Sequence, residues 1–341
     1  MLRQRLAFGG LPLGALEEAL TRAQSAGWTQ AFRAVAAELA WLARAAQSEG
    51  RSRSAIQYWR WAATALHGAS LSLHFEASGE GARLRRLAAI AYARALRLDG
   101  SLGRAVAIEG DGLRIRGYLR TPSGAASGVV VLLNGLDSVC EVELHAFGGA
   151  FVERGLAVLA VDVPGDYASR PRAPLLAVER VAPALAARVR AELGALPLMA
   201  FGVSFGGFLA ARMLCGDPPA VAAVAVSPSA FFSAAHAALP RIRRMLRLSF
   251  GVEDGEIDAL CARLALETLP PPRGALLVLA MQHDQLFGAE HLQAFRRWAA
   301  SIPLQVREWP AEHVGTSIVH KWLPAAADWL CERAADREGR A

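Results

Sequence analysis

Three polar residues have the types and the chain order that nucleophilic catalysis requires: Ser204, Asp284 and His313. A serine hydroxyl attacks a carbonyl carbon when a histidine removes its proton, and a carboxylate orients that histidine. Ser204 is the centre of a Gly-x-Ser-x-Gly pattern at residues 202–206, directly after an apolar run and directly before a helical stretch. Such a turn lifts the hydroxyl above a sheet, at a helix N-terminus. The alternative is an ordinary tight turn between a strand and a helix.

The expected partners of Ser204 lie after two later apolar runs. Asp284 follows the run Ala275–Ala280, and His313 follows the run Leu304–Trp309. Because the carboxyl ends of parallel strands meet at one edge of a sheet, we expect the three side chains to converge there. The order Ser, Asp, His is also the order typical of this arrangement.

Other residues fit these roles less well. Glu290 and Glu312 are the alternatives for the acid, and a helix N-cap is the alternative role for Asp284. His283 is next to Asp284 in the chain, so their side chains point apart. The other six histidines lie in the helical N-terminal region, on later expected helices or in a long insertion: His67, His74, His145, His236, His291 and His320.

Two backbone N–H groups are expected to bind the negative oxygen that forms during the attack. They are those of Phe205, directly after the nucleophile, and Leu136, in the loop after an earlier strand. Gly135 permits close approach of that loop, although a tight turn with Ser138 capping the next helix is the alternative. Asp137 is unusual here, because a carboxylate disfavours a nearby anion unless it is paired, protonated or used on the substrate.

The first hundred residues show helical periodicity only. Expected helices are Leu16–Ala26, Thr29–Gln47 with Thr29 as N-cap, Ser54–Leu73 and Gly81–Leu98. No 34-residue self-similarity is present, which favours a helical appendage over a repeat solenoid.

From about residue 102 the pattern changes to that of an α/β fold. Arg104–Glu109 and Leu113–Arg120 alternate as antiparallel strands do. Short continuous apolar runs then alternate with helical stretches, which predicts a mostly parallel sheet flanked by helices. The expected further strands are Gly128–Leu133, Leu156–Val163, Leu196–Val203, Val221–Val226, Ala275–Ala280 and Leu304–Trp309, and the helices are Val142–Arg154, Leu175–Leu193, Phe205–Leu214, Glu290–Ala300 and Ile318–Ala334. Residues 228–270 interrupt this alternation where a lid would be inserted.

Composition excludes several classes of protein. The 341 residues are 53% hydrophobic and 20% charged, which is typical of a globular chain. The net charge is +6, but the basic residues are dispersed, so no nucleic-acid partner is expected. No apolar stretch reaches membrane-span length, and no signal peptide is evident. The four cysteines form no CxxC pattern, so we expect no metal and a cytoplasmic location.

Taken together, these features resemble one branch of the α/β-hydrolases. The helical N-terminal region, the Asn-Gly-Leu-Asp-Ser loop at 134–138, the turn at Ser204, Asp284 and His313 carry the resemblance over nearly the whole chain. The branch contains the fermentation–respiration switch protein, 2,6-dihydroxypseudooxynicotine hydrolase and fungal polyketide-shortening hydrolases. It implies a helical cap domain over residues 1–101, a catalytic domain over residues 102–341, and a homodimer.

The resemblance also bears on the substrate. Some members cleave carbon–carbon bonds next to a carbonyl, which implies that Asp137 places the substrate or moves protons. The family's Asp-x-Pro-Gly-x-Gly turn departs here at Asp166 and Tyr167, and Asn134 stands where many relatives carry Gly or His. We expect the segment from Asp162 to Tyr167 to be a rigid turn. Aromatic and histidine residues of the cap that could reach a pocket, although a place in the core is their alternative, are Tyr58, Trp59, Trp61, His67, Phe75 and Tyr92.

The sequence therefore predicts a serine hydrolase without metal or organic cofactor. Its expected substrate is a hydrophobic small molecule, aromatic or polyketide-like, cleaved at a C–C bond next to a carbonyl (retro-Claisen) or at an ester or thioester. One alternative is an acyltransferase, cyclase or thioesterase of secondary metabolism that uses the same acyl-enzyme. Another is a non-catalytic interaction protein that keeps the fold to bind a partner.

Overall fold

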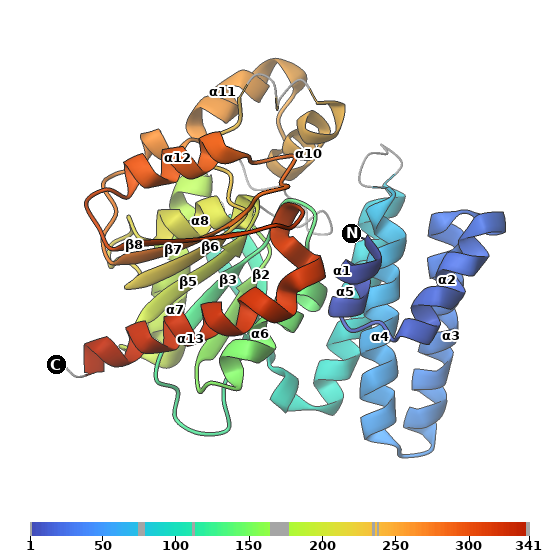
Figure 1. Cartoon of the computed structure of the whole chain (residues 1–341). Coiled ribbons are helices and arrows are strands. Elements are labelled where there is room, and N and C mark those ends of the chain that lie inside the picture. The colour runs from blue at the N-terminus through green and yellow to red at the C-terminus, as the bar shows by residue number, and fades with distance from the viewer. Residues whose placement is uncertain are drawn as a thin grey trace.

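One eight-stranded sheet organises the chain, and five N-terminal helices pack beside it (Figure 1). The computed structural model describes residues 2–73, 79–110, 113–163, 177–233, 236 and 239–338. The expected turn at 164–167, which includes Asp166 and Tyr167, lies outside these ranges, as do His74 and Phe75.

The sheet has the mostly parallel form that the sequence predicted. The strand order is β1-β2-β4-β3-β5-β6-β7-β8, with the first two pairings antiparallel and the remaining ones parallel. Strands β3, β4, β5 and β6 are buried along their whole length, as expected for strands covered on both faces. The strands are β1 (Arg104–Gly110), β2 (Leu113–Arg120), β3 (Val129–Leu133), β4 (Ala157–Val161), β5 (Leu198–Val203), β6 (Ala222–Val226), β7 (Ala275–Met281) and β8 (Leu304–Trp309).

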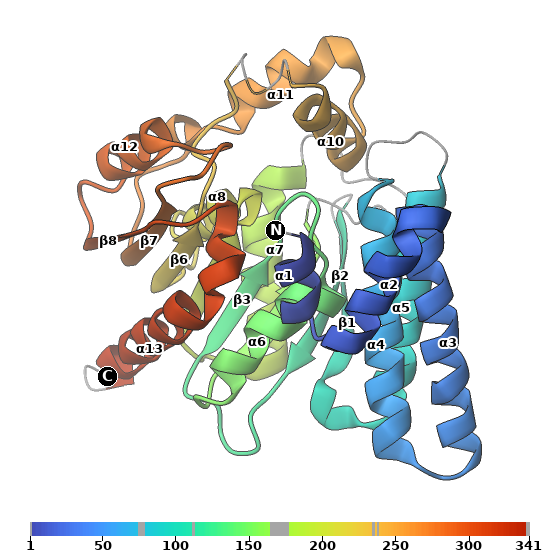
Figure 2. The same cartoon turned by 45° about the vertical axis from the view of Figure 1, so that its right-hand side comes forward.

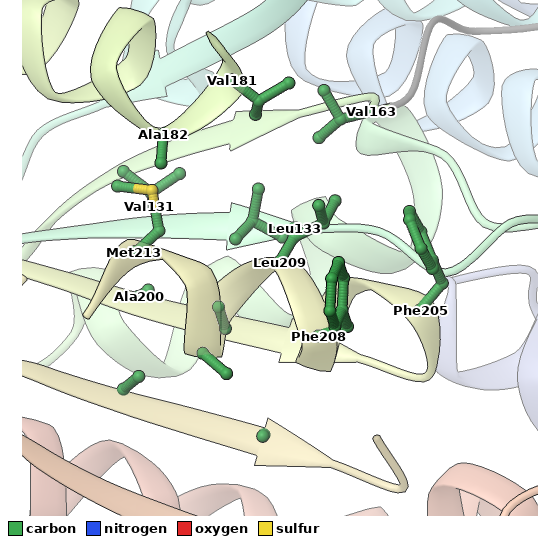
Figure 3. Packing of buried hydrophobic residues seen from close by; sticks show 14 of the residues in the cluster. Val131, Leu133, Val163, Val181, Ala182, Ala200, Phe205, Phe208, Leu209 and Met213 are labelled. Carbon is green, nitrogen blue, oxygen red and sulfur yellow. The ribbon is translucent and has the colours of Figure 1, made fainter. Parts of the chain in front are cut away.

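Helices cover both faces of this sheet. On one face lie α7 (Ala177–Leu193), α8 (Phe205–Met213) and α12 (Ala289–Trp298). Figure 3 shows how α8 covers this face, with its residues Phe208, Leu209 and Met213 beside side chains of β3 and β5. On the other face lie the π-helix η2 (Cys140–Leu144), α6 (His145–Val152) and α13 (Val319–Glu338).

The N-terminal helices join the second of these faces. They are α1 (Leu2–Phe8), α2 (Leu13–Ala26), α3 (Trp28–Ser48), α4 (Ser52–Leu71) and α5 (Glu80–Leu98), followed by the short η1 (Gly100–Leu102). In Figure 2, α1 lies in front of α6, between the sheet and the long helices. Helix α1 is not among the helices expected from the sequence.

Thr29 is not the N-cap of α3. The helix begins after Gly27, and the Thr29 hydroxyl instead contacts the Ala69 carbonyl at 3.3 Å and the Ser72 hydroxyl at 2.8 Å. The predicted cap was wrong because a tertiary contact with the end of α4 takes the side chain.

The insertion between β6 and β7 is helical. It contains α10 (Pro240–Phe250), η3 (Asp254–Glu256), α11 (Ile257–Arg263) and η4 (Leu266–Thr268). The rings of Phe232 and Phe250 lie 6.1 and 5.8 Å from the ring of Phe205, at the start of α8. The insertion therefore packs against the turn that carries Ser204. No helix among the described residues has both the length and the hydropathy to span a membrane.

The sheet owes part of its stability to Phe201 on β5, whose fully buried ring lies 5.4 Å from Phe147 and 5.3 Å from Phe151. We expect Phe201→Ala to lower the free energy of unfolding by about 3–5 kcal/mol, because the neighbouring rings cannot fill the cavity. Urea denaturation measures this, with exposed Trp41→Ala as the control. Equal losses in the two variants would contradict this account of the core.

Candidate active site

Ser204 occupies a strained turn between β5 and α8. Its backbone has φ 57° and ψ −122°, a conformation that non-glycine residues rarely adopt. A Cβ at Gly206 would lie 2.1 Å from the Leu133 carbonyl oxygen, and one at Gly202 would lie 1.9 Å from the Gly206 carbonyl oxygen. The two glycines of the sequence pattern are therefore required by close backbone approach, as its steric interpretation predicted.

Asp284 and His313 form a hydrogen-bonded pair. The Nδ1 atom of His313 lies 2.7 Å from Oδ2 of Asp284. The other carboxylate oxygen, Oδ1, accepts from the backbone N–H groups of Leu286 at 2.8 Å and Phe287 at 3.0 Å. Asp284 is not the N-cap of α12, whose N-cap is Gly288. The carboxylate assigns the proton of a neutral His313 to Nδ1, which leaves Nε2 as a base.

The environment of Asp284 favours its charged form. Burial of its side chain would raise its pKa, but the hydrogen bond and charge of His313 and the two backbone N–H groups outweigh burial. The pKa of Asp284 therefore lies below its ordinary value of 3.8. At neutral pH the acid of this pair is therefore ionised, and it is bonded to a partly exposed imidazole, which is the arrangement a general base needs.

The Ser204 turn and the His313 loop are fastened to the same strand end. The backbone N–H of Ser204 donates to the Val226 carbonyl at 2.8 Å. The next residue, Ser227, accepts a hydrogen bond from the Val314 backbone N–H at 2.9 Å. Hence the end of β6 anchors both the serine and η5 (His313–Ile318).

Backbone strain is concentrated at this place. Among the described residues, the non-glycine residues with positive φ are Ser204, Ser227 (43°) and Val314 (68°). Each lies in the cluster just described, and such conformations typically persist at functional sites because the surrounding structure imposes them.

The loop after β3 lies directly against the serine. A Cβ on Gly135 would lie 3.2 Å from Cβ of Ser204. Asn134 ties the loop to β4, because its Oδ1 accepts from the Val163 N–H at 2.7 Å and its Nδ2 donates to the Ser138 carbonyl at 3.1 Å. The alternative that Ser138 caps the next helix is wrong, since its hydroxyl accepts from the Gly135 N–H at 2.9 Å within the loop.

Two backbone donors remain available beside Ser204. Within the described part of the chain, the N–H groups of Leu136 and Phe205 donate to no acceptor. Phe205 is the first residue of α8, where N–H groups have no partner inside the helix and the helix dipole favours negative charge.

Asp137 is paired with an arginine from the first helix of the chain. Nη1 of Arg5 donates to Oδ2 of Asp137 at 2.9 Å, and Nη2 donates to the Asp137 carbonyl at 2.8 Å. Arg85, from α5, donates to the same carbonyl at 3.1 Å. A carboxylate beside an anion site was expected to be paired, protonated or used on the substrate. The structure shows that Asp137 is paired.

Arg5 also binds a second, deeper carboxylate. Its Nε donates to Glu143 at 2.5 Å, and Glu143 further contacts Nε2 of His67 at 2.9 Å and the Val139 N–H at 3.1 Å. Burial opposes ionisation of Glu143, but the charge of Arg5 and the contacts with His67 and Val139 hold its pKa well below the ordinary value. Burial lowers the pKa of His67, which keeps that ring neutral.

Among the residues that the structure describes, two groups of side chains have the composition of a metal site, but their contacts oppose that role. In the group of His236, Glu290 and His291, the Ala230 N–H donates to Nδ1 of His291 at 3.1 Å, which leaves the proton on Nε2. Both ring nitrogens of His236 are also hydrogen-bonded.

The second group is Cys140, Glu141 and Asp162. Arg116 lies 2.9 Å from Glu141 and 3.5 Å from Asp162 and already supplies a positive charge. Burial raises the pKa of the Cys140 thiol, so it does not offer a thiolate.

The cap residues proposed as pocket contacts are mostly core residues. Trp59, His67 and Tyr92 are buried, and the Tyr92 hydroxyl lies 2.6 Å from Nδ1 of His145. Tyr58 and Trp61 are half-buried and pack edge to face on one another at 5.6 Å.

Sequence reasoning missed Arg5, Glu143 and Ser227. Each acts through a partner far away in the chain, 132 residues in the case of Arg5 and Asp137, and none belongs to a recognisable pattern. The segment around Arg5 offers no local signal, because Arg3 and Gln4 stand beside it and make its charge unremarkable.

The sheet order, the strand-to-helix turn and its flanking helices define the class of protein: the chain has the α/β-hydrolase fold. A sequence profile described as "Esterase FrsA-like" matches residues 19–266, most of the chain, and the protein belongs to this family. It is a hydrolase, which confirms the expected class of enzyme and the resemblance stated from the sequence. The matched range includes Ser204 and Asp137 and ends before Asp284.

Solved structures share this fold. The crystal structure of 2,6-dihydroxy-pseudo-oxynicotine hydrolase superposes with a TM-score of 0.85 at 18% identity, over 97% of this chain and 95% of that one. Wild-type AbyA5 gives 0.67 at 16% identity, over 95% of each chain. Est1E from Butyrivibrio proteoclasticus gives 0.51 at 15% identity, over 68% of this chain and 99% of that one. No curated protein sequence matches this chain.

The depressed pKa of Glu143 predicts a pH dependence of stability. Its stabilising contribution is present above its ordinary pKa of 4.5 and is lost as the pH falls toward its lowered folded-state pKa. Between about pH 6 and pH 3, the wild type should lose roughly 1–2 kcal/mol more unfolding free energy than Glu143→Gln. Urea denaturation at the two pH values measures this. Exposed Glu49→Gln is the control, and it should behave like the wild type.

Proposed function

We propose that the protein is a serine hydrolase with Ser204 as nucleophile, His313 as general base and Asp284 as the group that orients His313. The observation that carries this proposal is the anchoring of the strained Ser204 turn and the His313 loop on consecutive residues at the end of β6. A buried carboxylate bonded to Nδ1 of a histidine and a serine at a helix N-terminus, both anchored at the end of the same strand, are the parts of an acyl-transfer site.

The proposed reaction has two stages. Oγ of Ser204 attacks the substrate carbonyl carbon while Nε2 of His313 takes its proton, and the N–H groups of Leu136 and Phe205 bind the resulting oxyanion. The tetrahedral intermediate breaks its bond to the leaving group, which receives the proton from His313. Water, activated by the same imidazole, then attacks the acyl-enzyme, releases a carboxylic acid and restores Ser204.

The surroundings of His313 support an apolar, aromatic-rich substrate. The ring of Phe287 lies 5.5 Å from the ring of His313, and Phe232 lies 5.9 Å from Phe287 and 6.1 Å from Phe205. We propose that these rings line the approach to the site and that the 228–270 insertion is a lid. We propose residues 1–101 as the cap domain, since Arg5 and Arg85 contact the loop beside Ser204.

For cleavage of a C–C bond, the leaving group is an enolate, which takes its proton from His313 after the bond breaks. The carboxylate of Asp137, which pairs with Arg5 through Oδ2, is suited to accept hydrogen bonds from a substrate. We therefore propose that Asp137 orients a substrate hydroxyl or enol beside the oxyanion loop. Its side chain is 24% exposed, which leaves it accessible to a ligand.

A fluorophosphonate probe tests the nucleophile. We expect one adduct on the wild-type protein, located on Ser204 by peptide mass spectrometry, none on Ser204→Ala, and a normal adduct on the surface control Ser48→Ala. The same proteins should then be assayed on p-nitrophenyl butyrate, butyryl-thiocholine and 1-phenyl-1,3-butanedione. Turnover that persists in Ser204→Ala would refute the proposal, and the preferred compound separates ester, thioester and C–C cleavage.

Asp284→Asn tests the orienting carboxylate. The amide can donate to Nδ1 and so stabilise the wrong tautomer, and we expect kcat to fall about 10³- to 10⁴-fold. Because the pKa of Asp284 is depressed, the acid limb of kcat/KM in the wild type should show the titration of one group, with slope one. Exposed Asp328→Asn is the control. A slope of two, or an active Asp284→Asn, would remove Asp284 from this role.

A further inference from the structure

Helix α1 is wedged between the cap helices and the catalytic domain. Leu6 is fully buried on the cap side, where a Cβ on Gly68 would lie 3.2 Å from its Cδ1. On the other side the ring of Phe8 lies 4.8 Å from that of Phe147 in α6. Figure 2 shows the helix in this position. The next turn of the chain is fixed too, because Thr64 in α4 donates to the Gly9 carbonyl at 3.0 Å.

From this position every nitrogen of the Arg5 guanidinium is hydrogen-bonded, two of them to the loop that carries Leu136. Nη1 and Nη2 bind the carboxylate and the carbonyl of Asp137, and Nε binds Glu143. The side chain is only 13% exposed. A planar fork with donors on three nitrogens fits this set of acceptors, whereas a lysine ammonium cannot span them.

The contacts of Arg5 help to fix the loop on both sides of Leu136. The residue before Leu136 is fixed by the bond between the Gly135 N–H and Ser138, and the residue after it, Asp137, is fixed by Arg5 and Arg85. The direction of the Leu136 N–H depends on both anchors. In addition, Arg5 supplies a positive charge to Asp137, which would otherwise oppose an oxyanion at the neighbouring residue.

We propose that Arg5 is a positioning residue of the active site, which aims the Leu136 N–H at the oxyanion and neutralises Asp137, so that helix α1 completes the catalytic centre. This inference rests on the proposed function. Arg5 touches no substrate atom and acts through the loop, so its loss should slow the chemical step and leave substrate binding nearly unchanged.

The test compares Arg5→Ala and Arg5→Lys with Arg3→Ala. Arg3 lies on the same helix, pairs with Glu17 and is 58% exposed, so it is a matched control. On p-nitrophenyl butyrate, Arg5→Ala should lower kcat about 10- to 100-fold with KM changed less than about twofold, somewhat less than the loss of an oxyanion donor. Arg5→Lys should stay close to Arg5→Ala, and Arg3→Ala close to wild type. Guanidinium chloride at tens of millimolar should restore part of kcat in Arg5→Ala alone.

Loss of Arg5 also leaves Glu143 buried without its cation, which can unfold the protein. The double variant Arg5→Ala/Glu143→Gln removes that buried charge and still leaves Asp137 without the hydrogen bonds and charge of Arg5, so it should fold and keep the defect in kcat. A wild-type kcat in Arg5→Ala or in the double variant would overturn the proposal. A raised KM with unchanged kcat would also overturn it, since Arg5 would then serve substrate binding.

A readout without catalysis separates this proposal from the function itself. Hydrogen exchange of the peptide that contains residues 134–139 should be faster in Arg5→Ala than in Arg3→Ala, and unchanged exchange would overturn the positioning role even if the wild type turned over none of the test compounds. Conversely, ester turnover that persists in Ser204→Ala would refute the proposed nucleophile. Faster exchange in Arg5→Ala would still show that Arg5 holds the loop.

Discussion

The backbones of β3, β5 and α8 meet so closely at Ser204 that no side chain fits between them. The Gly206 position touches the Leu133 carbonyl, and the Gly202 position touches the Gly206 carbonyl. This contact has two consequences for the site. It forces Ser204 into a positive φ, which lifts its side chain out of the turn, and it brings the start of α8 next to the loop that follows β3. The close packing of α8 on β3 and β5 is therefore sufficient to bring the N–H groups of Phe205 and Leu136 to the same serine. No other residue of the site is needed for this.

The strained backbone conformations at this place are held by the sheet. Residues at unfavourable φ cost of order 1–3 kcal/mol each, and Ser204, Ser227 and Val314 are all of this kind. Each is held by a backbone or side-chain hydrogen bond to an adjoining strand end, and the strands beneath are buried on both faces. Fully buried parallel strands form a rigid support, so the chain can keep unfavourable conformations at their carboxyl ends.

Regular patterns account for what could be predicted from the sequence. Continuous apolar runs predicted the bounds of the buried strands to within about two residues, and the glycines around Ser204 predicted the turn. Both predictions succeed because these features depend on residues that are close in the sequence. The positions of Asp284 and His313 followed from the rule that loops after parallel strands share an edge, and their hydrogen bond agrees with it. Their catalytic roles stay predictions.

What could not be predicted depends on distant partners. Helix α1 is seven residues long and buries one of them, Leu6, so it gives no periodicity to detect. The role of Arg5 depends on its contacts with Asp137 and Glu143, which are far away in the sequence. Thr29 was predicted as a cap because the sequence does not indicate its contact with Ser72. Asn134 was noted as a departure from relatives, yet its role as the clamp between β3 and β4 needs the three-dimensional structure.

The polar contacts between the N-terminal helices and the catalytic domain are better explained by geometry than by stability. Buried ion pairs such as that of Arg5 with Glu143 lose much of their attraction to desolvation, and an apolar substitute of the same shape would often serve stability equally well. Apolar contacts have no preferred direction, so two packed surfaces can shift relative to one another. A guanidinium that donates hydrogen bonds from three nitrogens fixes both the position and the orientation of its acceptors. The directed contacts of Arg5 with Asp137 hold one end of the loop beside Ser204, which apolar packing alone would hold less closely. The N-terminal helices therefore place their buried charges against the loop that carries the proposed oxyanion donor, the N–H of Leu136.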